Sequence, residues 1–247
     1  MADTPKAILL IADISGYTRF MRQHAIATSH AKQIVVRLLK ALMQASRPPL
    51  KVAELEGDAV FFYALSSESN ASAVADQVKS LMVRFFTAFY KEIDAINQVK
   101  TCSCDACDCV GDLKLKQVVH CGDVGIERIA QFEKLFGIDV ILVHRMLKNS
   151  VPSKEYVMMT DSIFSFMKGF FGLEPERRKE SFEGVGEVET LVFYPADVIE
   201  KNQREQLIPG RGSMMSKALW RIRITFTTIM ELQGWKKFKG VFRNLPA

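Results

Sequence analysis

A short apolar segment that ends in an acidic residue constrains the fold of this chain more than any other stretch. Residues 7–20 read AILLIADISGYTRF, and positions 8–12 have the length and composition of a buried strand. Asp13 follows at the point where such a strand reaches the edge of its sheet. Backbone N–H groups at the start of the next helix would favour phosphate there. The pattern predicts a metal ligand beside a phosphate-binding turn; the alternative is that Asp13 only ends the strand and caps a helix.

A second carboxylate follows a glycine in a predicted hairpin. Residues 54–63 read ELEGDAVFFY, which indicates a strand, a tight Gly57-Asp58 turn and another strand. If this hairpin pairs beside the first strand, Asp13 and Asp58 can share one or two divalent cations. Oxygen ligands of this kind suit Mg²⁺ or Mn²⁺ bound together with substrate phosphates. The alternative is an ordinary hairpin in which Gly-Asp serves the turn alone.

Other patterns give the remaining secondary structure. Apolar periodicity predicts helices over 18–46 and 71–99, a hairpin over 113–129, a helix over 139–147 and a last hairpin over 177–194. The order of strands and helices favours an α/β or α+β domain.

At this point the chain resembles the catalytic domain of class III adenylate and guanylate cyclases, in a divergent bacterial branch of cyclase-like proteins. The matching segments are 13–18 (DISGYT), 54–58 (ELEGD), 136–146 (FGIDVILVHRM) and 182–188 (FEGVGEV). They occur in the family's order and span most of residues 6–195. The resemblance implies a ferredoxin-like fold with an antiparallel-rich central sheet flanked by helices, formed by residues 1–197.

The resemblance also implies roles for individual residues. It assigns the Mg²⁺ or Mn²⁺ ions to Asp13 and Asp58 with the Ile14 carbonyl, and it makes Arg145 the transition-state arginine. The residues that it assigns to phosphates or base are Ser15, Gly16, Tyr17, Thr18, Glu54 and Lys134. The family builds its site between two subunits, so a homodimer is implied as well.

Several positions depart from the family pattern. Ile141 stands where the family has an asparagine that donates a hydrogen bond, and Glu183 and Val185 stand where many members have phosphate-binding lysines. Glu54 resembles guanylate cyclases, but Lys134 is unusual at the second base-reading position, so either purine remains open. We therefore expect a domain that binds a purine nucleoside triphosphate with metal and cyclises it slowly. The alternative is a catalytically degenerate domain that senses nucleotide or binds a protein.

Four of the five cysteines lie close together, in the segment 101–110. They are Cys102, Cys104, Cys107 and Cys109. Clustered thiolates bind zinc well, although the usual zinc sites separate two cysteine pairs by a longer loop. We expect either a structural Zn²⁺ site away from the nucleotide, or a reduced loop, or a disulfide switch.

The C-terminal segment, residues 198–247, carries the basic charge of the protein. From Gln203 onward the chain has nine Lys or Arg and two Glu, whereas the rest is slightly acidic. After a Pro-Gly linker, basic and aromatic residues alternate along a predicted amphipathic helix. We expect it to pack on the domain or a dimer mate; an anionic membrane surface or an acidic protein partner is the alternative. No nucleic-acid reader accompanies the charge, so we expect no nucleic-acid partner.

The composition, 48% hydrophobic and 25% charged, is that of a globular protein. No stretch reads as a signal peptide or as an uncharged run long enough to span a bilayer. The five cysteines are odd in number and mostly clustered, which argues against a secreted disulfide framework. We expect a cytoplasmic protein, peripheral at the membrane if the tail binds there.

Overall fold

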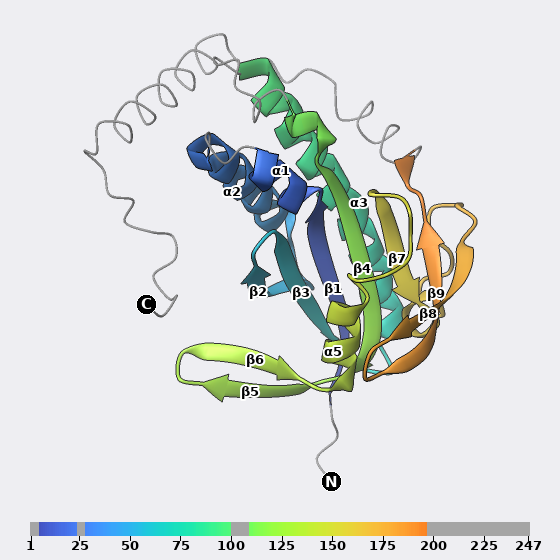
Figure 1. Ribbon diagram of the computed structural model, residues 1–247. Coiled ribbons are helices and arrows are strands. Elements are labelled where there is room, and N and C mark those ends of the chain that lie inside the picture. Colours follow the sequence, from blue (N-terminus) through green and yellow to red (C-terminus); the bar gives the residue numbers. More distant parts are fainter. Residues whose placement is uncertain (1–4, 24–27, 100–108, 197–247) are drawn as a thin grey trace.

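The computed structural model describes residues 5–23, 28–99 and 109–196. Its helices and strands follow the order expected from the sequence in most of this range (Figure 1). In chain order they are β1 (Lys6–Ser15), α1 (Tyr17–Gln23), α2 (Thr28–Ala45), β2 (Lys51–Glu56), β3 (Ala59–Ser66), α3 (Ala71–Val99), η1 (Val110–Asp112), β4 (Lys114–Asp123), β5 (Gly125–Ile129), β6 (Phe132–Phe136), α5 (Ile138–Arg145), β7 (Tyr156–Thr160), α6 (Asp161–Phe164), β8 (Glu176–Phe182) and β9 (Gly186–Phe193).

The described strands form a large central sheet and a separate two-stranded arm. Strand order in the large sheet is β2-β3-β1-β4-β7-β9-β8. Within it, β4 and β7 run parallel, and every other neighbouring pair is antiparallel. This confirms the predicted α+β fold with an antiparallel-rich sheet flanked by helices.

The alternation of side chains along β1 creates a core on each face of the sheet. Even-numbered positions such as Ile8 and Leu10 pack with α2 and α3, where Phe62 of β3 stacks on Phe85 at 4.8 Å between ring centroids. Odd-numbered positions such as Leu9 pack with the apolar side of α5. Because successive strand residues point to opposite faces, Asp13, also at an odd position, belongs to the α5 side.

The helices differ from the prediction at one place. The helix α3 has the predicted bounds, but the single helix predicted over 18–46 is two helices, α1 and α2. Residues 24–27 between them lie outside the described residues.

The predicted hairpin over 113–129 is wrong. Its first strand, β4, is paired with β1 on one side and with β7 on the other, so neither edge is free for β5. Instead β5 pairs with β6, with Gly125 opposite Phe136, through a short connection in which Ala130 has φ 54°. Figure 1 shows this β5–β6 arm extending away from the large sheet.

Two sequence predictions fall outside the described residues. The amphipathic tail lies within 197–247, and three of the four clustered cysteines lie within 100–108. Among the helices that the structure describes, none has both the length and the hydropathy needed to cross a membrane.

Candidate active site

Two acidic residues, Asp13 and Asp58, meet at one end of β1. Together with Lys116, described below, they form what we call the carboxylate edge. Asp58 lies in the turn between β2 and β3, after Gly57, whose φ of 62° suits a glycine. The backbone N–H of Ile14 donates to the carbonyl oxygen of Asp58 at 3.1 Å, which fixes the turn against β1. The two carboxyl groups are close enough to interact electrostatically. The structure therefore confirms that Asp13 and Asp58 are neighbours, and their binding of a metal ion stays a prediction.

The electrostatics of this pair are unfavourable without a further positive charge. Burial, followed by the negative charge of Asp13, raises the pKa of Asp58 from 3.8 to about 6. The backbone hydrogen bond of Asp58 and the charge of Lys116 act in the opposite direction but are outweighed. A divalent cation held by both carboxylates would remove this repulsion.

Lys116 of β4 is the residue at this edge that sequence reasoning missed. It pairs directly with Asp13 in the register of β1 and β4, and its Nζ lies 2.9 Å from Asp13 Oδ2. It also donates to the Leu147 carbonyl just after α5, at 3.3 Å. Burial alone would lower the pKa of Lys116, but Asp13, Tyr156 and Asp58 together outweigh burial and raise it, so the ammonium is charged. The sequence signal that could have indicated Lys116 is a charged residue within the otherwise mostly buried strand β4.

The turn between β1 and α1 has the shape that the sequence predicted. Ser15 ends β1 and is buried, and Gly16 has a φ of 90°, which L-residues rarely adopt. The helix α1 starts at Tyr17, and the N–H of Phe20 donates to the carbonyl of Gly16 at 2.9 Å. Phosphate binding by the amides of residues 15–18 stays a prediction.

The two expected base-reading residues are joined by an ion pair and line the same pocket. Lys134 Nζ of β6 lies 2.6 Å from Glu54 Oε2 of β2, and both side chains are more than two-fifths exposed. The pocket has a volume of about 390 Å³ and an apolar wall that includes Phe61, Phe136 and Val140. Its size and mixed lining suit a planar heterocycle with polar edges.

Arg145 ends α5 and is paired within its own chain. Its guanidinium donates to Glu183 Oε2 at 2.6 Å, and the side chains are 38% and 84% exposed. Glu183 is one of the positions where the sequence departs from the cyclase pattern. Ile141, the other main departure, is half exposed on α5. Screening by water makes the Arg145–Glu183 pair weak, so a stronger anion could displace Glu183.

Polar side chains fix α5 to the sheet along its length. In the first turn, Asp139 Oδ1 accepts from His120 Nε2 at 2.9 Å, and burial lowers the pKa of His120 despite this carboxylate. A Cβ at Gly122 would lie 2.2 Å from Asp139 Cγ, so only glycine leaves room for the carboxylate. One turn later, His144 contacts Glu56 Oε1 at 2.7 Å, and this contact raises the pKa of His144.

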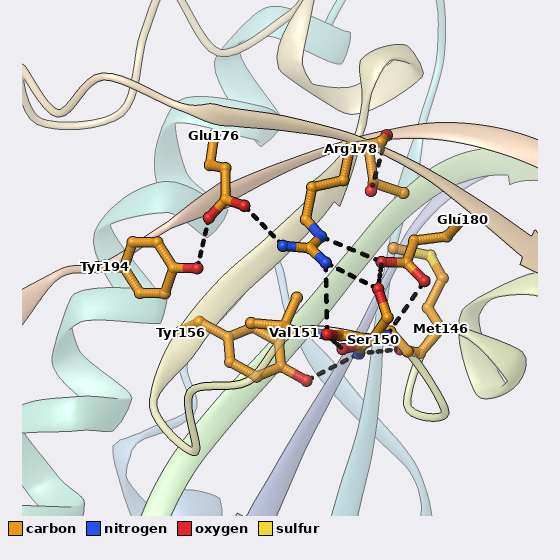
Figure 2. Close-up of polar contacts among 10 residues, drawn as sticks. Met146, Ser150, Val151, Tyr156, Glu176, Arg178, Glu180 and Tyr194 are labelled. Atoms are coloured by element: carbon orange, nitrogen blue, oxygen red, sulfur yellow. Dashed lines mark hydrogen bonds and ion pairs between the residues drawn. The ribbon is translucent and has the colours of Figure 1, made fainter.

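A third contact fixes the loop after α5. The Glu180 carboxylate of β8 is buried and accepts from the Ser150 backbone N–H at 3.1 Å and hydroxyl at 2.7 Å. Arg178 donates to Glu180 at 3.2 Å and to Glu176 at 2.6 Å. Figure 2 shows Arg178 between these two glutamates, with Ser150 below it. The network ties the end of α5 to the β8–β9 hairpin.

The predicted zinc site is untested. Of its four cysteines, Cys109 is described, directly before η1. Cys102, Cys104 and Cys107 lie outside the described residues. Within the described ranges, no three His, Cys, Asp or Glu side chains gather into a metal-binding group.

Sequence comparison finds relatives without an assigned activity. The profile of a family described as "Protein of unknown function (DUF2652)" matches residues 35–156. The "Uncharacterized protein Rv2561/Rv2562" of Mycobacterium tuberculosis (strain ATCC 25618 / H37Rv) is 35% identical over 212 residues, which cover 85% of this chain and 94% of that protein.

Structure comparison finds cyclases. The adenylyl cyclase CyaB from P. aeruginosa superimposes with a TM-score of 0.59 at 14% identity, over 77% of this chain and 94% of that one. The guanylyl cyclase Cya2 gives 0.58 at 15% identity, over 77% and 92%. At these identities the likeness shows a shared fold, that of class III nucleotidyl cyclase catalytic domains.

Proposed function

Because the chain belongs to the family of the mycobacterial protein Rv2561/Rv2562 and has the fold of nucleotidyl cyclase catalytic domains, we propose that it binds a purine nucleoside triphosphate with a divalent cation. The observation that carries this proposal is the carboxylate edge. Asp13 and Asp58 come from segments 45 positions apart, yet their carboxyl groups are neighbours beside the β1–α1 turn. Carboxylates held together against their mutual repulsion are typical of a cation site.

The donor set fits Mg²⁺ or Mn²⁺ bound through the substrate. Two carboxylates and the Ile14 carbonyl are too few for a closed protein cage, but Mg²⁺ is usually held by one or two carboxylates plus phosphates. When bound, such a cation neutralises charge on the phosphate oxygens. Around it, the residue 15–18 turn holds phosphates, and Glu54 and Lys134 border the pocket for the base.

We propose slow cyclisation as the reaction. The 3′-hydroxyl oxygen bonds to the α-phosphorus of the same nucleotide, the hydroxyl proton is lost, and pyrophosphate leaves. Arg145 neutralises the charge that develops on the α-phosphate. Ile141 can donate no hydrogen bond there, and the loss of one such donor costs on the order of a hundredfold in rate.

The proposal includes a homodimer in which the carboxylate edge of one copy meets the partner's Arg145. The face formed by α5 and the β5–β6 arm supports it, because large apolar side chains are exposed there. They are Ile129, Phe132, Phe136, Ile138 and Ile141. Exposed apolar groups in this number are typical of an interaction surface.

A second candidate function is nucleotide sensing without chemistry. The observation that favours it is the Arg145–Glu183 ion pair, which occupies the arginine that cyclisation would need. In this case the same site binds nucleotide, and binding changes how the domain contacts a partner.

Thermal unfolding with ligands tests nucleotide binding. Among ATP, GTP, CTP and UTP, we expect at least one of the two purine nucleotides to raise the melting temperature in the presence of Mn²⁺, since a ligand at a hundred times its Kd contributes about 2.7 kcal/mol. Asp13→Ala with Asp58→Ala should abolish the shift. Asp123→Ala, which removes an exposed carboxylate at the other end of the sheet, should keep it. No shift with any triphosphate would contradict the proposal.

Product analysis separates the two candidate functions. Wild-type protein incubated with Mn²⁺ and the triphosphate that binds should form a 3′,5′-cyclic nucleotide and pyrophosphate slowly, and Arg145→Ala should form none. Binding without any cyclic product would favour nucleotide sensing.

A further inference from the structure

We propose that Lys116 is an internal counter-ion that competes with divalent metal for Asp13, so that the site takes up metal together with triphosphate and binds free metal poorly. This inference rests on the proposed function. It concerns the lysine that the structure brings to the carboxylate edge and that sequence reasoning missed.

The position of Lys116 follows from the pairing of two central strands. Asp13 and Lys116 are direct partners in the β1–β4 register, and neighbouring pairs continue regularly on both sides. The ammonium is 2.9 Å from Asp13 Oδ2, and the two side chains are 18% and 12% exposed. Water therefore screens this ion pair much less than the exposed pairs at Lys134 and Arg145.

The charge balance explains the competition. With Lys116 and both carboxylates ionised, the edge carries a net charge of −1, which attracts a divalent cation weakly. A cation bound at Asp13 must share the carboxylate with the ammonium or displace it, and both are positive. A triphosphate reverses this balance, because its negative charge can be neutralised by the metal and by Lys116 together.

Lys116 also has a second contact that remains when Asp13 is taken by metal. Its Nζ donates to the Leu147 carbonyl, two residues beyond Arg145. Displacement from Asp13 would leave Lys116 attached to the segment that follows α5. The lysine would then couple metal binding to the position of that segment.

Free Mn²⁺, measured by electron paramagnetic resonance during titration, tests the inference without any turnover. We expect Lys116→Gln to bind free Mn²⁺ at least tenfold more tightly than wild type, since glutamine is neutral and can still donate to Leu147. Lys116→Arg, which keeps the charge, should resemble wild type. Lys114→Gln removes a charge from the same strand without touching Asp13 and should change the affinity by less than about twofold.

Two further measurements keep the result decisive. The double variant Asp13→Asn with Lys116→Gln should lose the gained Mn²⁺ affinity, which shows that the ion binds at Asp13. Lys116→Gln should also bind Mn²⁺ with triphosphate less tightly than wild type, the reverse of its effect on free Mn²⁺. Circular dichroism of each variant confirms that it is folded.

The outcomes separate this inference from the proposed function. Equal or weaker binding of free Mn²⁺ by folded Lys116→Gln, with normal metal–triphosphate binding in wild type, would overturn the competition and leave the proposed function standing. No binding of Mn²⁺ by any variant, with or without triphosphate, would overturn both.

Discussion

The carboxylate edge and the arginine helix α5 hold the two halves of the candidate site, and they are built differently. At the carboxylate edge, Asp13 and Lys116 are less than a fifth exposed and are fixed by strand register. At the end of α5, Arg145 and Glu183 are 38% and 84% exposed and are joined by a single ion pair. The first half is preorganised by the sheet, whereas in the second the Arg145 side chain can change its partner although α5 itself is attached to the sheet.

This difference suggests that nucleotide and metal binding can be separated from catalysis by mutation. Exposed ion pairs contribute about 0–1 kcal/mol, so Arg145 can exchange Glu183 for another anion at little cost. A partly buried charge at the carboxylate edge has no such freedom. If its partner is removed, the charge is left unpaired in a place where water can hardly solvate it, and this destabilises the protein. We therefore expect nucleotide and metal binding to be robust and catalysis to depend on how α5 is held.

The largest expected effect is a difference in stability between variants of two glutamates of the β8–β9 hairpin. Glu180→Ala should lower the free energy of unfolding by about 2–3 kcal/mol, because the buried carboxylate accepts two hydrogen bonds from Ser150. Glu183→Ala should change it by less than about 0.5 kcal/mol, since Glu183 is exposed. Urea denaturation measures both. Equal losses would mean that the exposed Arg145–Glu183 pair stabilises the fold as much as the buried Glu180–Ser150 contact.

A smaller effect is expected at the carboxylate edge and depends on pH. The pKa of Asp58 is about 6 in the folded state, whereas its ordinary value is 3.8. The folded state thus binds more protons between these values, and stability falls as pH rises from about 4 to 6. At 1.36 kcal/mol per pKa unit and with a discount for partial exposure, Asp58→Asn should be more stable than wild type by about 1–2 kcal/mol at pH 7.

The pH series provides its own control. The advantage of Asp58→Asn should vanish near pH 4, where Asp58 is protonated in the folded state. Denaturation midpoints at pH 4, 5, 6 and 7 measure the trend. An advantage that stays constant across this range would show that neither the burial of the charged Asp58 carboxylate nor its repulsion by Asp13 is the cause.

The smallest effect is expected at the base pocket. Lys134→Met breaks the exposed pair with Glu54 and should change the free energy of unfolding by less than about 0.5 kcal/mol. The same variant should change the relative affinity for ATP and GTP if the pocket holds the base. A decrease in the free energy of unfolding of more than about 1 kcal/mol would instead show that the Lys134–Glu54 pair is as strongly held as the ion pair at the carboxylate edge.

Local patterns were enough to predict the carboxylate edge in outline. The alternating apolar run of β1 and the Gly57-Asp58 turn each have a short-range signal, and pairing of β1 with β3 then brings Asp13 and Asp58 together. The helix α3 was predicted with its full bounds because its apolar periodicity extends over many turns.

The parts that sequence reasoning missed depend on contacts between distant segments. Lys116 acquires its role only when β4 pairs with β1, and Glu180 only when β8 packs on the loop after α5. The β5–β6 arm was missed for the same reason: β7 takes the edge of β4 that a hairpin would need. Strand pairing of this range has no local signature.

The space at Gly122 gives a way to follow α5 through related sequences. Any side chain at this position would overlap the Asp139 carboxylate that contacts His120. The three positions should therefore change together: a relative with a larger residue at 122 is expected to lack the acid at 139 and to have no need of a histidine at 120. In a relative that has the glycine, the acid and the histidine at these three positions, we expect α5 to be attached to the sheet as it is in this protein.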